Sequence, residues 1–101
     1  MGETSNCDGV LELELGKKWR PALERDRRKH YDMESAHVVC RQLGCGHALR
    51  SNERYGSEYQ DVWFTRSSCK GSETRAKDCI YHSGNSKSME LRVIKCSGNK
   101  Q

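Results

Sequence analysis

The sequence has few of the residues that build a large apolar core. Only 34% of its 101 residues are hydrophobic, and it contains a single Phe and a single Pro. It has no run of about eighteen apolar residues and no apolar stretch at its polar start MGETSN, so we expect neither a membrane-spanning helix nor a secretion signal within these residues. It also lacks a Cys-x-x-Cys pair, which argues against a zinc ribbon or a thioredoxin-type redox site. So small a core needs a further source of stability.

Cysteines can supply that stability. The chain has six of them, Cys7, Cys40, Cys45, Cys69, Cys79 and Cys96. An even number in a chain of this size favours a disulfide framework, in which each bridge contributes about 2–4 kcal/mol by restricting the unfolded chain. Disulfides persist in oxidising compartments, so we expect an extracellular protein. We also expect Met1 and Gly2 to be an added start on a domain taken from a longer secreted or membrane-anchored protein.

Zinc binding is the alternative use of these cysteines. One of His30, His37, His47 or His82 could complete a ligand set. The spacings match no common zinc finger, however, and an intracellular metal module is the less favoured class.

Positive charge is concentrated in one segment. Between Lys17 and His30 seven basic residues stand against two acidic ones, which gives +5 in a chain whose formal net charge is +4. Clustered guanidinium groups bind phosphate, sulfate and carboxylate through paired hydrogen bonds, and neighbouring cations raise the local potential. The candidate ligand-binding residues are therefore Arg20, Arg25, Arg27, Arg28 and Lys29. A plain solvated surface is the alternative, and nucleic acid would bind such a patch only without sequence specificity.

The first half of the chain predicts two short strands and one helix. Residues 10–15 alternate between apolar and acidic side chains, as in a half-buried strand. A second extended stretch begins at Trp19, and Pro21 should confine it to an edge or end it early. A helix should start after Asp32 as N-cap and stop at Gly44. Its inward face would carry the apolar residues Ala36, Val39, Cys40 and Leu43, with His37 on the outer surface.

The second half predicts more loop than regular structure. Residues 47–60 and 82–88 are polar, so we expect a long loop and a flexible turn there. Residues 62–64 and 91–95 are short apolar strands. Ser72 should cap a short helix that ends near Cys79. We expect Trp19 and Trp63 to be core residues.

These segments together resemble the scavenger receptor cysteine-rich domain. The resemblance is most specific at AHVVCRQLGCG, residues 36–46. CDGVLEL is similar to the family's opening Cys-x-Gly-x-Val-Glu-Val strand, KKWRPAL to its Trp-Gly-Thr-Val-Cys segment and YDMES to its Trp-Asp-Leu-Glu-Asp helix entry. VWF, CKGSE, KDC and VIKCS follow in the family's order. The resemblance implies an α+β fold: a small disulfide-stapled domain in which a twisted antiparallel sheet cradles one main helix, with a second short helix.

The resemblance also implies a disulfide pairing. The family's eight-cysteine form (group B) has cysteines where this chain has Leu23 and Ser86, and those two cysteines pair with each other. The chain therefore resembles that form with one bridge missing. The remaining bridges implied are Cys7 with Cys45, Cys40 with Cys96, and Cys69 with Cys79. A single domain should span residues 7–97, between linker or added residues 1–6 and a tail at 98–101.

The function implied by the resemblance is that of a non-enzymatic ligand-binding module in a secreted or cell-surface receptor of innate immunity. Its partners would be a bacterial polyanion, modified lipid, glycosaminoglycan or extracellular protein, without membrane insertion, and the basic segment 24–30 would bind them. With all cysteines paired, no nucleophile is left for an enzyme. The alternative is an accessory domain of a larger secreted protein, such as a protease or amine oxidase, with no ligand of its own.

The resemblance suggests one candidate cofactor, calcium. Family members often carry acidic residues that bind calcium beside the basic loop. Here only Glu24, Asp26 and Glu90 stand near those positions, because Arg25 and Leu91 replace expected acids. So few oxygen ligands make a calcium site doubtful, so we expect no cofactor.

Overall fold

The computed structural model describes residues 7–25 and 32–98, in which one five-stranded sheet curves around a single α-helix. The sheet order is β1-β5-β4-β3-β2. The elements in chain order are β1 (Asp8–Val10), β2 (Glu12–Leu15), β3 (Lys18–Glu24), α1 (Met33–Gln42), β4 (Ala48–Ser67), the 3₁₀ helix η2 (Ala76–Asp78) and β5 (Ile80–Cys96).

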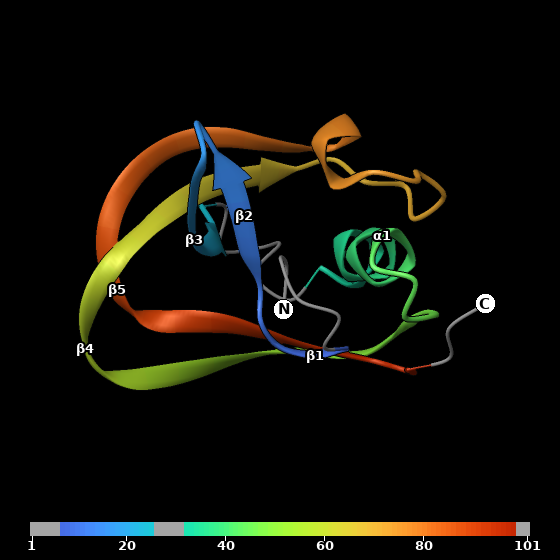
Figure 1. Ribbon diagram of the computed structural model, residues 1–101, viewed down its shortest axis with the longest axis horizontal. Coiled ribbons are helices and arrows are strands. Elements are labelled where there is room, and N and C mark those ends of the chain that lie inside the picture. The colour runs from blue at the N-terminus through green and yellow to red at the C-terminus, as the bar shows by residue number, and fades with distance from the viewer. Residues whose placement is uncertain (1–6, 26–31, 99–101) are drawn as a thin grey trace.

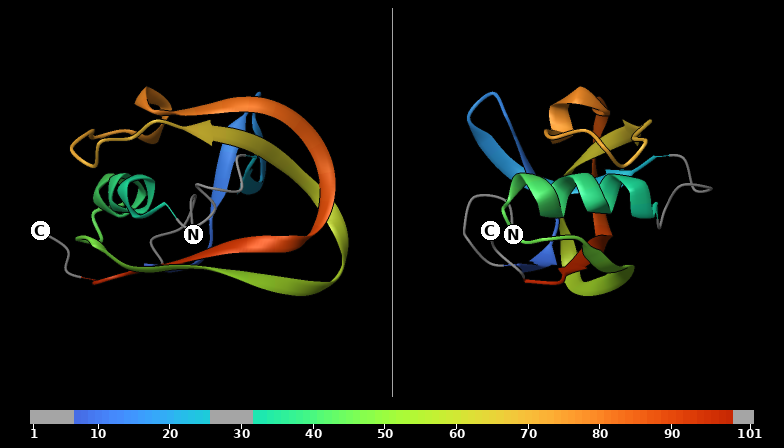
Figure 2. Two further views of the ribbon diagram at one scale, coloured as in Figure 1. Left: turned by 180° about the vertical axis from the view of Figure 1, so that it is seen from behind. Right: turned by 90° about the vertical axis from the view of Figure 1, so that its right-hand side faces the viewer.

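Two long strands form the frame of the molecule. β4 and β5 pair along most of their length and bend together around one end, and α1 lies in the opening between their two arms (Figure 1). The view from behind shows the same arrangement (Figure 2). The expected α+β fold with a sheet cradling one main helix is therefore confirmed.

The sheet is mixed rather than antiparallel as expected. β3 runs parallel to β4, with Ala22 opposite Trp63 and Glu24 opposite Thr65. A parallel pair needs a long crossover connection, which is usually helical. In this chain α1 lies in the connection between β3 and β4, so the helix that fills the opening also permits the parallel pairing.

The expected loop at 47–60 and turn at 82–88 are wrong, because both segments belong to long strands. β4 pairs with β5 from Ala48 opposite Cys96 to Ser67 opposite Ile80. Most side chains from 49 to 61 are exposed, so the segment is polar although its backbone is paired. The register shifts between Tyr55 and Gln60, around Gly56. Backbone pairing with an apolar partner strand, rather than their own composition, makes these residues extended.

The β2–β3 hairpin explains the place of Pro21. Gly16 and Lys17 both have positive φ, which matches a two-residue type I′ turn. The Ala22 N–H donates to the Leu11 carbonyl at 3.0 Å, so the next rung, Glu12 with Pro21, does not need a hydrogen bond from the proline. The prediction that Pro21 ends the strand early or holds it at an edge is therefore wrong.

Helix α1 begins and ends as its sequence predicts. The Asp32 carboxylate accepts a hydrogen bond from the Glu34 N–H at 3.0 Å, and Gly44 has φ +71° just after the helix. The helix buries Ser35, Ala36, Val38, Val39 and Cys40.

The second helix is shorter than expected. Ser72 does not cap it, because η2 starts only at Ala76. The Glu73 carboxylate instead accepts hydrogen bonds from the N–H groups of Lys70 and Gly71.

Three disulfides join these elements. They connect Cys7 with Cys45, Cys40 with Cys96, and Cys69 with Cys79, which are the pairs that the family resemblance implies. The first two tie α1 and the turn after it to the start of β1 and the adjacent end of β5. In the described part of the chain, no helix is long and apolar enough to cross a membrane.

Candidate functional site

Arg20 lies on β3, in the extended stretch that the sequence predicts from Trp19. Its guanidinium carbon is 4.4 Å from the centre of the Trp63 ring, a cation–π contact. The Trp63 indole N–H donates to the Leu13 carbonyl at 3.0 Å, and the edge of the His82 ring packs on the same indole. Trp63 is buried as expected, and Arg20 packs on its ring as well as contributing to the positive surface.

Arg25 directly follows β3 and is exposed. Its backbone N–H donates to the Thr65 carbonyl, and its side chain donates to the Ser83 carbonyl at 3.1 Å. The guanidinium therefore sits over the start of β5, near the Phe64 ring. Asp26 and the other three candidate ligand-binding residues, Arg27, Arg28 and Lys29, lie outside the described residues.

Glu24 is not a loop residue as expected but the last residue of β3, and only 5% of it is exposed. The Ser67 hydroxyl donates to its carboxylate at 2.6 Å and lies 3.1 Å from the Asp32 carboxylate. Glu24 and Asp32 flank the basic segment, so both ends of this segment meet at Ser67. We call this group, together with the residues around Arg92, the buried polar cluster: Glu24, Asp32, Ser35, Ser51, Ser67 and Arg92.

Arg92 supplies the positive charge of the buried polar cluster. Only 3% of it is exposed, and its guanidinium donates to the Asp32 carbonyl at 2.6 Å and to the hydroxyls of Ser35 and Ser51. Burial lowers the pKa of Arg92, while the charges of Asp32 and Glu24 act in the opposite direction. The cluster thus pairs a buried cation with two acids that bracket the basic segment.

This arrangement does not fit a calcium site. Glu24 faces the buried Arg92 charge and accepts a hydrogen bond from Ser67. Glu90 lies on β5 opposite Tyr55. A hard cation needs six to eight oxygen ligands, and a neighbouring guanidinium works against it. Of the three candidate calcium ligands, Glu24 therefore lies near the Arg92 charge, Glu90 lies on β5, and Asp26 is outside the described residues.

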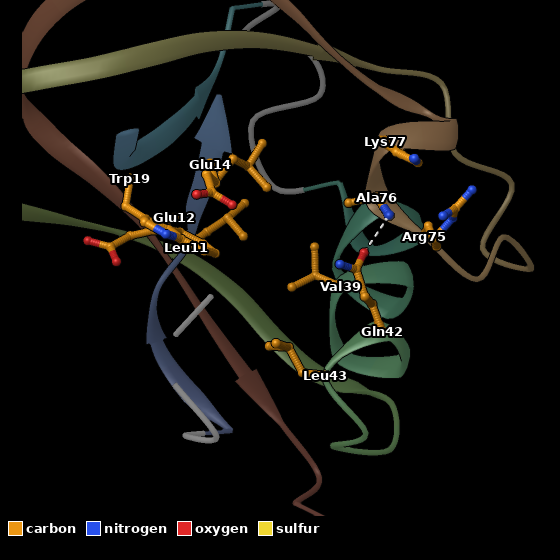
Figure 3. A pocket seen from close by; sticks show the side chains of 11 residues that line it. Leu11, Glu12, Glu14, Trp19, Val39, Gln42, Leu43, Arg75, Ala76 and Lys77 are labelled. Carbon is orange, nitrogen blue, oxygen red and sulfur yellow. Dashed lines mark hydrogen bonds between the residues drawn. The ribbon is translucent and has the colours of Figure 1, made fainter. Parts of the chain in front are cut away.

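A second feature is a pocket of about 350 Å³ between the β2–β3 hairpin, α1 and η2. Figure 3 shows Glu12, Glu14 and Trp19 on its hairpin side and Arg75 and Lys77 on its η2 side. The apolar side chains in it are Leu11, Leu13, Val39, Leu43 and Ala76. Trp19 is 36% exposed, so the expectation that it is a core residue is wrong.

Only weak sequence signals point to the buried polar cluster or to the pocket. Arg92 stands among apolar residues of the last strand, LRVIKC, and that position was the one hint of a buried charge. Glu24 and Asp32 are 68 and 60 residues away from it in the chain. The pocket brings together three segments that are far apart in the sequence. The only sequence signal for it is Trp19, which stands at its rim near the tip of the β2–β3 hairpin. His37, expected as plain surface, accepts a hydrogen bond from the Ala48 N–H.

Comparison with known proteins gives one consistent result. The family model for the scavenger receptor cysteine-rich domain matches residues 1–97. Human "CD5 antigen-like" is 32% identical over 79 residues, covering 73% of this chain and 21% of that protein. The "Egg peptide speract receptor" of Strongylocentrotus purpuratus is 32% identical over 83 residues, 80% of this chain and 14% of that protein.

Among solved structures, the dimeric form of the SRCR domain of mouse MARCO superimposes with a TM-score of 0.68 at 26% identity. The match covers 89% of this chain and 86% of that one. The chain spans about a fifth or less of the length of the two curated relatives.

Proposed function

The chain belongs to the scavenger receptor cysteine-rich family, and from this we propose that it is a non-enzymatic ligand-binding module of a secreted or cell-surface receptor. Relatives of this chain include the egg peptide speract receptor, which supports a receptor role. We propose further that its ligand is a polyanion, such as a bacterial surface polymer or a glycosaminoglycan, bound by the basic segment 24–30.

The observation that carries the polyanion proposal is the density of positive charge between two fixed points. Residues 25–31 carry four cations, Arg25, Arg27, Arg28 and Lys29, against one acid, Asp26. Arg25 is held by Ser83 at one end of the segment, and Asp32 is held by Ser67 and Arg92 at the other. A segment whose two ends are fixed has fewer conformations available before it binds. It therefore loses less conformational entropy on binding a ligand.

Charge reversal tests this proposal. We expect the triple variant Arg25→Glu, Arg27→Glu and Arg28→Glu to lose binding to immobilised heparin and to lipopolysaccharide at low salt. The matched control reverses three exposed arginines of β4, Arg50, Arg54 and Arg66, with the same change in net charge. It should weaken binding much less, and non-reducing peptide mapping should show three intact bridges in both variants. Equal loss in both variants, or none in the first, would contradict the role of the basic segment.

We also propose that the chain derives from the eight-cysteine form with one bridge absent. The support is the resemblance at Leu23 and Ser86. In the structure Leu23 is buried on β3 and Ser86 is exposed on β5, opposite Val62. Because β4 lies between β3 and β5, the two positions are not placed as a bridged pair in the described structure. In the variant Leu23→Cys with Ser86→Cys, a fourth bridge detected by peptide mapping would support this origin.

A further inference from the structure

β2 has a free edge. It is the last strand in the sheet order, and among the described residues it pairs only with β3. Hydrogen-bonded rungs alternate in an antiparallel pair, and the Leu11–Ala22 rung is bonded. The Leu13–Arg20 rung is therefore bonded as well, and the backbone N–H and C=O groups of Glu12 and Glu14 point away from β3.

These outward groups face the pocket. Four consecutive residues, Leu11 to Glu14, line it. Successive side chains of a strand point to opposite faces, so a pocket lined by all four must meet the strand along its edge. The opposite wall is formed by α1 and η2, and one short hydrogen bond, from the Ala76 N–H to the Gln42 side chain at 2.6 Å, joins them (Figure 3).

The pocket has the composition of a peptide site. Apolar side chains of β2 and α1 line its interior, and the half-exposed Trp19 stands at its rim. Its charges are divided between the walls: Glu12 and Glu14 lie on the hairpin side, and Arg75 and Lys77 on the η2 side. A volume of about 350 Å³ holds a few side chains rather than a whole folded element.

We propose that this edge binds an extended peptide segment of a protein partner by strand addition to β2. Backbone hydrogen bonds to Glu12 and Glu14 give the affinity, as in other strand-addition sites. Alternate side chains of the peptide are apolar and enter the pocket against Leu13, Val39 and Leu43. The side chains between them include a cation for Glu12 and Glu14 and an anion for Arg75 and Lys77.

The probe is a blocked heptapeptide with the sequence Lys-Val-Asp-Leu-Lys-Val-Asp, compared with a scrambled peptide of the same composition in which the apolar residues are adjacent. Titration of the ¹⁵N-labelled domain should shift the amide signals of residues 11–14, 43 and 75–77. Hydrogen exchange of the Glu12 and Glu14 amides should slow at least tenfold on saturation, because these amides gain acceptors. Fluorescence should also change, since Trp19 is exposed while Trp63 is buried.

A pair of variants isolates the backbone contribution. Glu14→Pro removes the outward N–H, and Glu14→Ala removes the same carboxylate but keeps the N–H. Because the Glu14 N–H is not used in pairing with β3, both variants should fold. We expect the proline variant to bind the peptide at least tenfold more weakly than the alanine variant. Should the proline variant not fold, the exchange measurement on the unaltered domain decides alone.

The outcomes are separable from those of the polyanion proposal. Unchanged exchange at Glu12 and Glu14, or equal binding by the proline and alanine variants, would overturn strand addition at β2. Tight binding of the scrambled peptide would overturn the alternating pattern. Heparin binding should be unaffected by Glu14→Pro, because this change leaves every residue of the basic segment 24–30 in place, and a loss of heparin binding in the basic-segment variant should leave peptide binding intact.

Discussion

At the scale of single residues, Arg92 carries the clearest stability prediction. Replacing it with Leu removes the charge that acts on the buried Glu24 and the half-buried Asp32, together with three hydrogen bonds, and leaving a buried charge without its cation costs about 3–5 kcal/mol. We expect urea unfolding at pH 7 to show a loss of this size. Lys95→Leu, an exposed cation on the same strand, should change stability by less than about 0.5 kcal/mol. Similar stability of the two variants would mean that the buried polar cluster is not an ion-pair network.

Glu73 gives a pH prediction. Hydrogen bonds from the backbone N–H groups of Lys70 and Gly71 lower the pKa of its carboxyl group. A lowered pKa in the folded state adds stability above the ordinary glutamate pKa, and this stability is lost as the pH falls through the lowered value. NMR titration should therefore place the Glu73 midpoint below the ordinary pKa of a glutamate side chain.

The variant Glu73→Gln checks the same linkage independently. It should be less stable than the unaltered domain at neutral pH, and the difference should shrink on acidification. If the difference in stability stays constant with pH, the charge of the Glu73 carboxylate does not stabilise the turn at Lys70 and Gly71.

Residue-level prediction from the sequence succeeded where the cause is local. Asp32 caps α1 and Gly44 ends it, because both roles depend on neighbours within a few positions. The burial of Glu24 could not be predicted in this way, since its partners Ser67 and Arg92 come from distant strands. The exposure of Trp19 depends on the turn that places it near the tip of a hairpin.

At the scale of elements, the disulfides differ in what they constrain. The Cys40–Cys96 bridge closes a separation of 56 residues and joins α1 to the end of β5, while Cys69–Cys79 closes only 10. Loop-closure arithmetic gives about 4 and about 3 kcal/mol as model-dependent figures. Removing each pair by double Cys→Ala substitution should therefore lower the melting temperature more for Cys40–Cys96.

Packing should enlarge the difference in melting temperature between the two double variants, because Cys40 and Cys96 are both buried, whereas Cys69 is partly exposed. Calorimetry under non-oxidising conditions measures the melting temperatures of both variants. A larger loss for Cys69–Cys79 would show that the segment around η2, not α1, limits the stability of the domain.

Element prediction failed mainly for the long strands. The polar segments 47–60 and 82–88 lack the alternation that marks a half-buried strand, so nothing local distinguishes them from loops. Their extension follows from pairing across the sheet with the segments that carry the apolar patterns: residues 48–60 pair with 88–96, and residues 82–88 pair with 60–65. The α1 helix, the strands at 62–64 and 91–95 and the cysteine pairing carry local or family patterns, and the structure contains all of them.

At the scale of the whole molecule, covalent bridges rather than metal should maintain the fold. We expect a chelator to leave the melting temperature unchanged, because Glu24, one of the acids at the family's calcium position, is buried near the Arg92 charge. A reductant should lower it strongly, since three bridges support a core of few large apolar residues. Differential scanning fluorimetry with each reagent, and with added calcium, makes the comparison. Marked stabilisation by calcium would contradict the assignment of Arg92 as the internal cation.

The crossed pair of bridges also decides how the domain would respond to mechanical force. Cys7 and Cys96 lie side by side, since the Cys96 N–H donates to the Cys7 carbonyl. Tension applied at these two residues passes from Cys7 to Cys45, back along the chain to Cys40, and across to Cys96. Only the six residues 40–45 carry the load, and fully extended they span about 20 Å. The remaining chain, from 8 to 39 and from 46 to 95, is mechanically shielded until a bridge is reduced, so a redox change would convert a nearly inextensible link into a long compliant one.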